Sequence, residues 1–88
     1  MKQIWKWRLD SMEMIYLDMP EDAEILDVQV QGGTPCIWAI CSPGSPVRTR
    51  KLALYGTGEP IIGDPGRHIG TFQISDGRLV LHVFEIDN

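Results

Sequence analysis

The sequence has little cysteine, no excess of basic charge and no long apolar run, and each shortage excludes a class of protein. Lys and Arg number 8 against 12 Asp and Glu, so the net charge is −4. That balance disfavours nucleic acid, which attracts basic domains. No apolar run approaches the roughly 20 residues of a membrane-spanning helix, and the first ten residues alternate in polarity, unlike a signal peptide. We expect a protein that does not bind a membrane and stays where it is made.

The few cysteines and histidines predict neither a disulfide nor a metal site. Cys36 and Cys41 fall in one expected strand, so they lie about 16 Å apart on opposite faces and cannot bridge each other. Two reduced thiols suit a cytoplasm. A zinc site needs more ligands at closer spacing, and His68 and His82 are the only histidines. We therefore expect no metal and no cofactor.

What the chain does contain is alternating polarity over nearly its whole length. With 88 residues, 43% of them hydrophobic and 23% charged, it has an ordinary globular composition, so residues 1–88 are expected to form a single β domain with a thin core. Residues 3–9 alternate and place Trp5 and Trp7 on one face, which we expect in the core. Residues 12–17 predict a second strand, paired with the first as a hairpin.

A Gly32-Gly33 pair between two alternating runs predicts a two-residue hairpin, because primed turns need the positive φ that glycine tolerates. The register that follows pairs Gln31 with Thr34, Val28 with Ile37, and Asp27 with Trp38. One face is then apolar, with Leu26, Val28, Val30, Ile37 and Ala39. The other is mixed and is either covered by solvent or binds a partner: Ile25, Asp27, Gln29, Gln31, Cys36, Trp38 and Ile40.

A second hairpin is predicted at Asp76-Gly77, after a fifth strand over residues 48–55. Its register pairs Ile74 with Leu79, Phe72 with Leu81, and Thr71 with His82. The last strand is apolar on both faces and is therefore expected in a central position, its outer face covered by the long loop or a second subunit. Together these patterns predict an all-β fold of about seven short strands: an antiparallel meander, a rolled sheet or an open barrel, with one long Gly-rich loop.

The Gly-rich stretch from Tyr55 to Ile74 is the main candidate site. Loops near 12 residues are uncommon unless they do something, yet its four glycines also suit a loop that merely turns several times. A phosphate-binding motif would need a helix to follow, and Glu59 would repel a phosphate. Exposed backbone N–H groups can still form an anion-binding nest. The candidate ligand-binding residues are Tyr55, Gly56, Thr57, Gly58, Arg67 and His68.

The remaining polar residues suggest a binding protein rather than an enzyme. His82, on an apolar strand, is more simply a hydrogen-bonded core residue, and Cys36 has no base beside it. No spacing places a catalytic set of carboxylates or a Ser/His/Asp triad, so no catalytic residue is assigned. The candidate partner-binding residues are Gln29 and Trp38 on the mixed face, with the basic stripe of Lys6 and Arg8.

Six segments, in this order and spacing, resemble those of a family of uncharacterised small proteins encoded by tailed phages and prophages: MKQIWKWRL, MPEDAEILDVQVQ, TPCIWAI, YGTGEPI, HIGTFQ and LVLHVFE. In that family the loop usually reads Gly-Thr-Gly-His-Pro, and here Glu59 stands at the histidine position. The departure argues against a required base or metal ligand there. The resemblance implies a phage gene product in the cytoplasm of the bacterial host.

Three hypotheses follow, because small phage proteins often block host defences. In the first, the protein sequesters a small anionic, nucleotide-like signal in pockets lined by the loop, at the interface of a homo-oligomer. In the second, it inhibits a host defence protein by binding it through Trp38 or the basic first strand. In the third, it is a virion or assembly component. The first two are favoured, and the sequence does not separate them.

Overall fold

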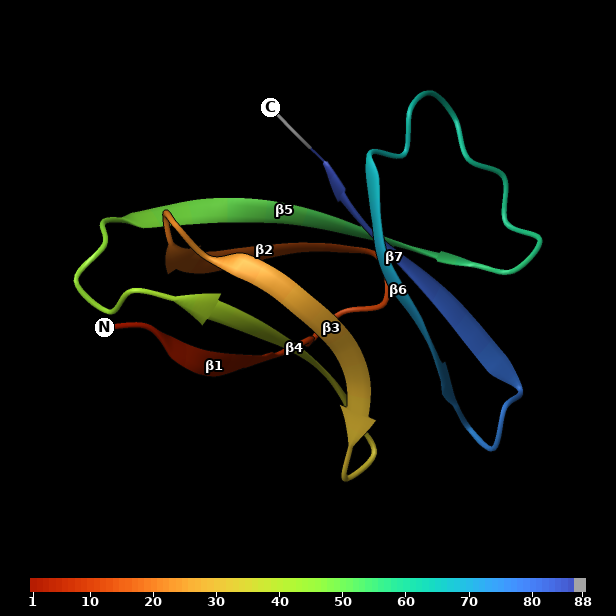
Figure 1. The fold of residues 1–88 in the computed structure, drawn as a ribbon. Coiled ribbons are helices and arrows are strands. Elements are labelled where there is room, and N and C mark those ends of the chain that lie inside the picture. The colour runs from red at the N-terminus through yellow and green to blue at the C-terminus, as the bar shows by residue number, and fades with distance from the viewer. Residues whose placement is uncertain (87–88) are drawn as a thin grey trace.

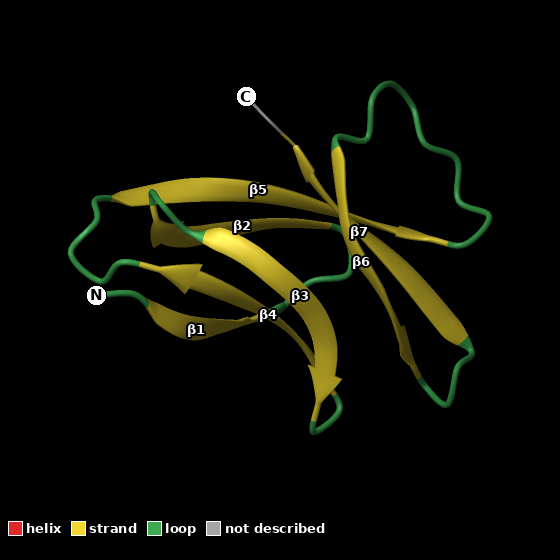
Figure 2. Cartoon of the chain, viewed as in Figure 1, coloured by secondary structure: helices red, strands yellow, loops and turns green. Residues whose placement is uncertain are grey.

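The computed structural model describes residues 1–86, and all their regular elements are β-strands (Figure 2). The strands are β1 (Gln3–Arg8), β2 (Met14–Pro20), β3 (Glu24–Gln31), β4 (Thr34–Cys41), β5 (Val47–Gly56), β6 (Arg67–Ile74) and β7 (Leu79–Ile86). The predicted all-β class and seven strands are confirmed.

The strands form two antiparallel sheets with the orders β1-β4-β3 and β2-β5-β7-β6, and they do not close into a barrel (Figure 1). The predicted hairpin of the first two strands is wrong, since β1 pairs with β4 and β2 pairs with β5. Both strands turn an apolar face to one core, but from opposite sheets. Their edges are linked by the Trp7 indole, whose Nε1 donates to the Asp18 carbonyl at 3.1 Å.

The β3–β4 hairpin follows the predicted register from Gln31 to Asp27, with φ of 57° and 83° at Gly32 and Gly33. A β-bulge at Leu26 then shifts the register, so that Ile25 lies opposite Ala39. The prediction that Leu26 lies on the apolar face is therefore wrong. Leu26 is turned outward and 50% exposed, and Ile25 packs against the core in its place.

The β6–β7 hairpin also has the predicted register, and β7 lies between β5 and β6 as expected. The turn occupies four residues between Ile74 and Leu79, not two. Ser75, Asp76 and Gly77 all adopt positive φ, and the Gly77 N–H donates to the Ile74 carbonyl at 3.2 Å. Asp and Gly tolerate this conformation better than most residues, so the sequence signal marks the turn correctly but not its length.

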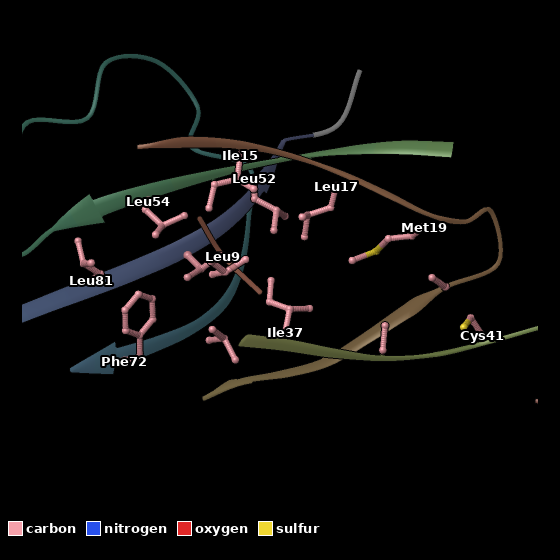
Figure 3. Packing of buried hydrophobic residues seen from close by; sticks show 14 residues of the cluster. Leu9, Ile15, Leu17, Met19, Ile37, Cys41, Leu52, Leu54, Phe72 and Leu81 are labelled. Atoms are coloured by element: carbon pink, nitrogen blue, oxygen red, sulfur yellow. The ribbon is translucent and has the colours of Figure 1, made fainter. Parts of the chain in front are cut away.

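The core lies between the two sheets (Figure 3). Leu52, Leu54, Leu81 and Val83 come from the four-stranded sheet, and Val28, Ile37, Ala39 and Cys41 from the three-stranded one. Trp5 and Trp7, predicted as core residues, are only half-buried and pack against its margin. Burying these indoles fully would leave their N–H groups short of acceptors, and at the margin each finds one.

The sheets come together where β6 lies against β3. A Cβ on Gly70 would lie 2.7 Å from Cγ1 of Val28, so the absence of a side chain allows this approach. The ladder between β6 and β7 is irregular from His68 to Gly70. At the opposite end of the core face of β7 lies Glu85, the one buried charged side chain among residues 1–86.

Candidate anion-binding site

A buried ion pair closes the end of the core. Glu85 follows Leu81 and Val83 on the same face of β7, and Arg50 precedes Leu52 on the same face of β5. The Nε and Nη2 atoms of Arg50 both donate to the Glu85 carboxylate, the second at 2.9 Å. Its Nη1 donates to the Ala23 carbonyl at 2.8 Å. The two side chains are only 10% and 9% exposed, so this is a fixed, bidentate pair.

The pKa of Glu85 lies below its ordinary value of 4.5. The hydrogen bonds from Arg50 are the main cause, and the positive charges of Arg67 and Arg48 add to them, against the opposing effect of burial. Glu85 is therefore a carboxylate at neutral pH, and its charge is balanced by Arg50.

A hollow of about 230 Å³ opens beside this pair and holds two further guanidinium groups. Arg67 is 62% exposed, and its Nη2 lies 3.5 Å from Oε1 of Glu85. Arg48 is exposed, and its positive charge contributes to lowering the pKa of Glu85. The hollow is lined by Glu21, Ala23, Arg48, Arg50, Arg67 and Glu85. We call it the arginine hollow.

A second hollow of about 370 Å³ adjoins it where the long loop returns to the sheet, lined by Asp64, Gly66, Arg67 and Ile86. The loop is fixed here by Gly66, which has φ of 92° and packs so closely on β7 that a Cβ would lie 2.2 Å from the Glu85 carbonyl oxygen. Its N–H donates to Oδ1 of Asp64 at 2.9 Å. Arg67 lines both hollows and joins them into one surface.

The structure does not bring the six predicted ligand-binding residues together. Arg67 lies on the core face of β6, opposite Glu85, whereas His68 lies on the outer face, opposite Phe84. The cause is the strand itself, because consecutive side chains point to opposite faces. The predicted set is thus divided between two sides of one sheet.

On the outer face, the start of the loop is held by a chain of hydrogen bonds. Oγ1 of Thr57 lies 2.8 Å from Nε2 of His82, and Nδ1 of His82 lies 2.9 Å from Oγ1 of Thr71, which is 3.2 Å from Nε2 of His68. Both nitrogens of His82 are engaged, so the expected hydrogen bonds are present, but His82 is half-buried on the outer face and not a core residue.

Aromatic contacts complete this outer cluster. The Phe84 ring lies 5.9 Å from Tyr55 and 5.2 Å from His68, between ring centroids. Beside it, Gly56 and Gly58 form a tight turn in which the Gly56 N–H donates to Oε2 of Glu59 at 3.0 Å. The Glu59 carboxylate thus occupies a backbone donor that an anion would need, so the start of the loop is a poorer anion site than its end.

The predicted partner-binding residues lie together on the outer face of the three-stranded sheet. Lys6 and Asp27 both pair with Trp38 in register, and Gln29 and Arg8 both pair with Cys36. A shallow, mostly apolar hollow of about 350 Å³ lies there, lined by Ile4, Leu26, Asp27, Gln29 and Trp38.

The roles of Arg48, Arg50 and Glu85 were not predicted from the sequence. A signal was present, because alternation along the last strand places Glu85 on the same face as Leu81 and Val83. A carboxylate on a core face needs a cation, and the fifth strand carries arginines at alternate positions, 48 and 50.

Metal ligands, membrane-spanning helices and reactive thiols are three further features that would bear on function in the described part of the chain. Residues 1–86 contain no group of three or more His, Cys, Asp or Glu arranged to hold a metal, and none of them forms a helix that could span a membrane. Cys36 and Cys41 are both buried and unpaired. Burial, with a smaller effect of Asp22, raises the pKa of the Cys41 thiol, which lowers its reactivity.

The fold and the site define a small two-sheet β-protein with a buried Arg-Glu pair at one end and an arginine-lined hollow beside it. The chain belongs to the family described as a domain of unknown function, DUF7352, whose model matches residues 1–88. No curated protein and no solved structure matches it.

Proposed function

We propose that this is a phage-encoded accessory protein that counters a host defence by sequestering a small anionic, nucleotide-like ligand. The observation that supports the proposal is the arginine hollow, in which three guanidinium groups gather on a chain of net charge −4. Such a gathering against the overall charge suits recognition of an anion. The ligand site is placed at the end of the loop, with Arg67, not at its start.

The three arginines have different roles in this proposal. Arg50 is held by Glu85 and the Ala23 carbonyl, so it shapes the hollow. Arg48 of β5 and Arg67 of β6 are exposed, and their planar guanidinium groups are suited to bidentate bonds with a phosphoryl group. The two carboxylates in the lining, Glu21 and Glu85, offset part of this charge, so the exposed guanidinium groups and not a large net charge would hold the anion.

The adjoining hollow provides room for the rest of a nucleotide. It shares Arg67 with the arginine hollow and is larger. Asp64 contributes a carboxylate there, which can accept hydrogen bonds from ribose hydroxyls in addition to the one from Gly66. A phosphoryl group between the arginines would thus place a sugar against the loop.

Binding without catalysis fits the groups that line the hollows. Guanidinium groups stay protonated at any physiological pH, and the pKa of Glu85 is lowered further from neutrality. A general acid or base works best with a pKa near the operating pH. We therefore propose that the ligand is held and not converted.

Isothermal titration tests the proposal with cyclic and ADP-ribose-type nucleotides and with inorganic phosphate. Replacing Arg48 and Arg67 together by Ala is expected to weaken binding at least about tenfold, since charge-assisted hydrogen bonds contribute about 1.5–3 kcal/mol each. Replacing Lys2 and Arg78 together by Ala is the matched control, because both are exposed and lie outside the hollow. The control should retain binding.

Two results would overturn the proposal. One is the absence of heat with every nucleotide tried. The other is an equal loss of affinity in the control, which would show that net charge and not the hollow determines binding.

A further inference from the structure

The outer face of the three-stranded sheet has a central row of three side chains that crosses all its strands. Trp38 of β4 lies opposite Lys6 of β1 on one side and Asp27 of β3 on the other. All three therefore project from the same face at the same level. The row has a cation at one end, an indole in the middle and an anion at the other.

The surroundings of this row are apolar and exposed. Ile4 is 59% exposed and Leu26 is 50% exposed, and both line the hollow beside Trp38. Leu26 is there because the β-bulge turns it out of the core. A contiguous exposed apolar patch with polar residues at its rim is typical of a surface that a partner covers.

Charge varies across the face in one direction. The β1 side carries Lys6 and Arg8, and the β3 side carries Asp27 and Glu24, which lies opposite Ile40. A two-fold axis that runs parallel to the strands, above Trp38, exchanges the two sides and keeps each residue at its level. Lys6 of one copy then faces Asp27 of the other, whereas Arg8 faces Gln29 and Glu24 faces Ile4.

We propose that a second copy of this chain covers this face in a two-fold dimer. Lys6 of each copy pairs with Asp27 of the other, and the two Trp38 side chains meet at the axis. An isologous contact of this kind needs a self-complementary patch. The central row meets this condition, because Lys6 faces Asp27 and Trp38 faces Trp38. The dimer is independent of the anion site, which lies elsewhere on the fold.

The hydrogen bonds that the row makes within one copy do not oppose this contact. Nζ of Lys6 donates to the Gln31 side chain at 2.6 Å, and the Asp27 carboxylate accepts from the Gln29 side chain at 2.9 Å. Both bonds are exposed and therefore contribute little. The main gain comes from covering Trp38 and its aliphatic neighbours, while the charges fix the orientation.

The face is small, so the dimer should be weak. Three strands spaced about 4.8 Å apart offer an area at the low end of specific interfaces. We expect a dimer that dissociates on dilution in the micromolar range, visible by light scattering or analytical ultracentrifugation over a range of concentrations.

Charge reversal tests the pairing directly. Lys6→Glu and Asp27→Lys should each shift dissociation to at least about tenfold higher concentration, because like charges then face each other across the axis. Mixing the two variants should restore dimers, since the mixed dimer has one native pair of Lys6 with Asp27 and one pair in which both charges are reversed. Trp38→Ala should be monomeric.

A matched control reverses the charges of Asp76 and Arg78 in the exposed β6–β7 turn and should leave the dimer unchanged.

Circular dichroism shows whether each variant folds. Asp27→Lys also removes the bond that the Asp27 carboxylate accepts from the Val28 N–H. If that variant does not fold, Lys6→Glu alone tests the proposal. A monomeric wild type overturns the proposal. If the wild type is monomeric and Trp38→Ala abolishes binding to a host protein, that protein and not a second copy covers this face. A dimer that survives both Lys6→Glu and Trp38→Ala also overturns the proposal. If both single variants fold but mixing restores nothing, Lys6 does not pair with Asp27.

Discussion

The two ends of the long loop, residues 57–66, lie near opposite ends of β7 and are fixed by different means (Figure 1). At its start, Thr57 is bonded to His82 on the outer face, within a cluster of hydroxyl, imidazole and aromatic side chains. At its end, Gly66 packs on the backbone of β7, and Arg67 faces the buried pair of Arg50 and Glu85.

The difference shows what makes a surface suitable for an anion. At the start, the donors are already used, since both nitrogens of His82 are bonded and Glu59 accepts the Gly56 N–H. At the end, one guanidinium is fixed by Glu85, and two others lie exposed around a hollow. Glycines occur near both ends of the loop, whereas a hollow lined by exposed guanidinium groups lies beside its end.

The largest expected effect comes from breaking the buried pair. Arg50→Ala would leave the Glu85 carboxylate buried without its main partner and should reduce the free energy of unfolding by about 3–5 kcal/mol, as measured by urea denaturation. Arg67→Ala is the comparison, because its bond to Glu85 is long and exposed. It should reduce stability by less than about 1 kcal/mol. Equal losses of stability in the two variants would contradict the assignment of Arg50 as the main partner of the buried Glu85 carboxylate.

The same pair predicts a dependence on pH. Because the folded-state pKa of Glu85 lies below 4.5, the carboxylate stabilises the fold fully above that pH, and the contribution is lost as pH falls through the lower folded-state value. The stability difference between wild type and Glu85→Gln should therefore shrink on acidification below pH 4.5. A difference that stays constant would contradict a charged Glu85.

Alanine at Gly58 and at Gly66, two of the positive-φ glycines of the loop, should distinguish the start of the loop from its end. Gly58→Ala meets open space and should only incur the backbone penalty of about 1–2 kcal/mol. Gly66→Ala incurs the same penalty and also collides with the Glu85 carbonyl. Thermal unfolding should show at least twice the loss for Gly66→Ala, and a smaller loss there would mean that the loop end is not fixed to β7.

The smallest effect is expected at the loop start. Thr57→Val removes the hydroxyl that bonds His82 and should reduce the unfolding free energy by about 1 kcal/mol or less, while Thr57→Ser should retain it. Neither should change the affinity for a nucleotide in isothermal titration. A loss of affinity in Thr57→Val would return the anion site to the start of the loop.

Much of the local structure was predictable because it depends on neighbours in sequence. Gly32-Gly33 and Asp76-Gly77 marked both hairpins, and alternation from those turns gave the correct pairs, Val28 with Ile37 and Phe72 with Leu81. The bulge at Leu26 was not predictable, because inserting one residue leaves no clear mark in a run that is apolar at both 25 and 26.

The candidate site was only partly predictable. Arg67 was identified, but with residues of the opposite face, since proximity in sequence was taken for proximity in space. Arg48 and Arg50 meet Arg67 only because β5 and β6 flank β7. That neighbourhood joins residues almost twenty positions apart, and no local pattern encodes it.

The sequence by itself determined most of the strands, two turns and, away from the bulge at Leu26, the face of most side chains, because period-two alternation and positive-φ residues act within a few positions. Only the tertiary structure decided that β1 pairs with β4 and not with β2, that Leu26 turns outward beside Trp38, and that Glu85 pairs with Arg50. Those outcomes depend on burying one core between two sheets and on neutralising a charge within it, and both are properties of the whole chain.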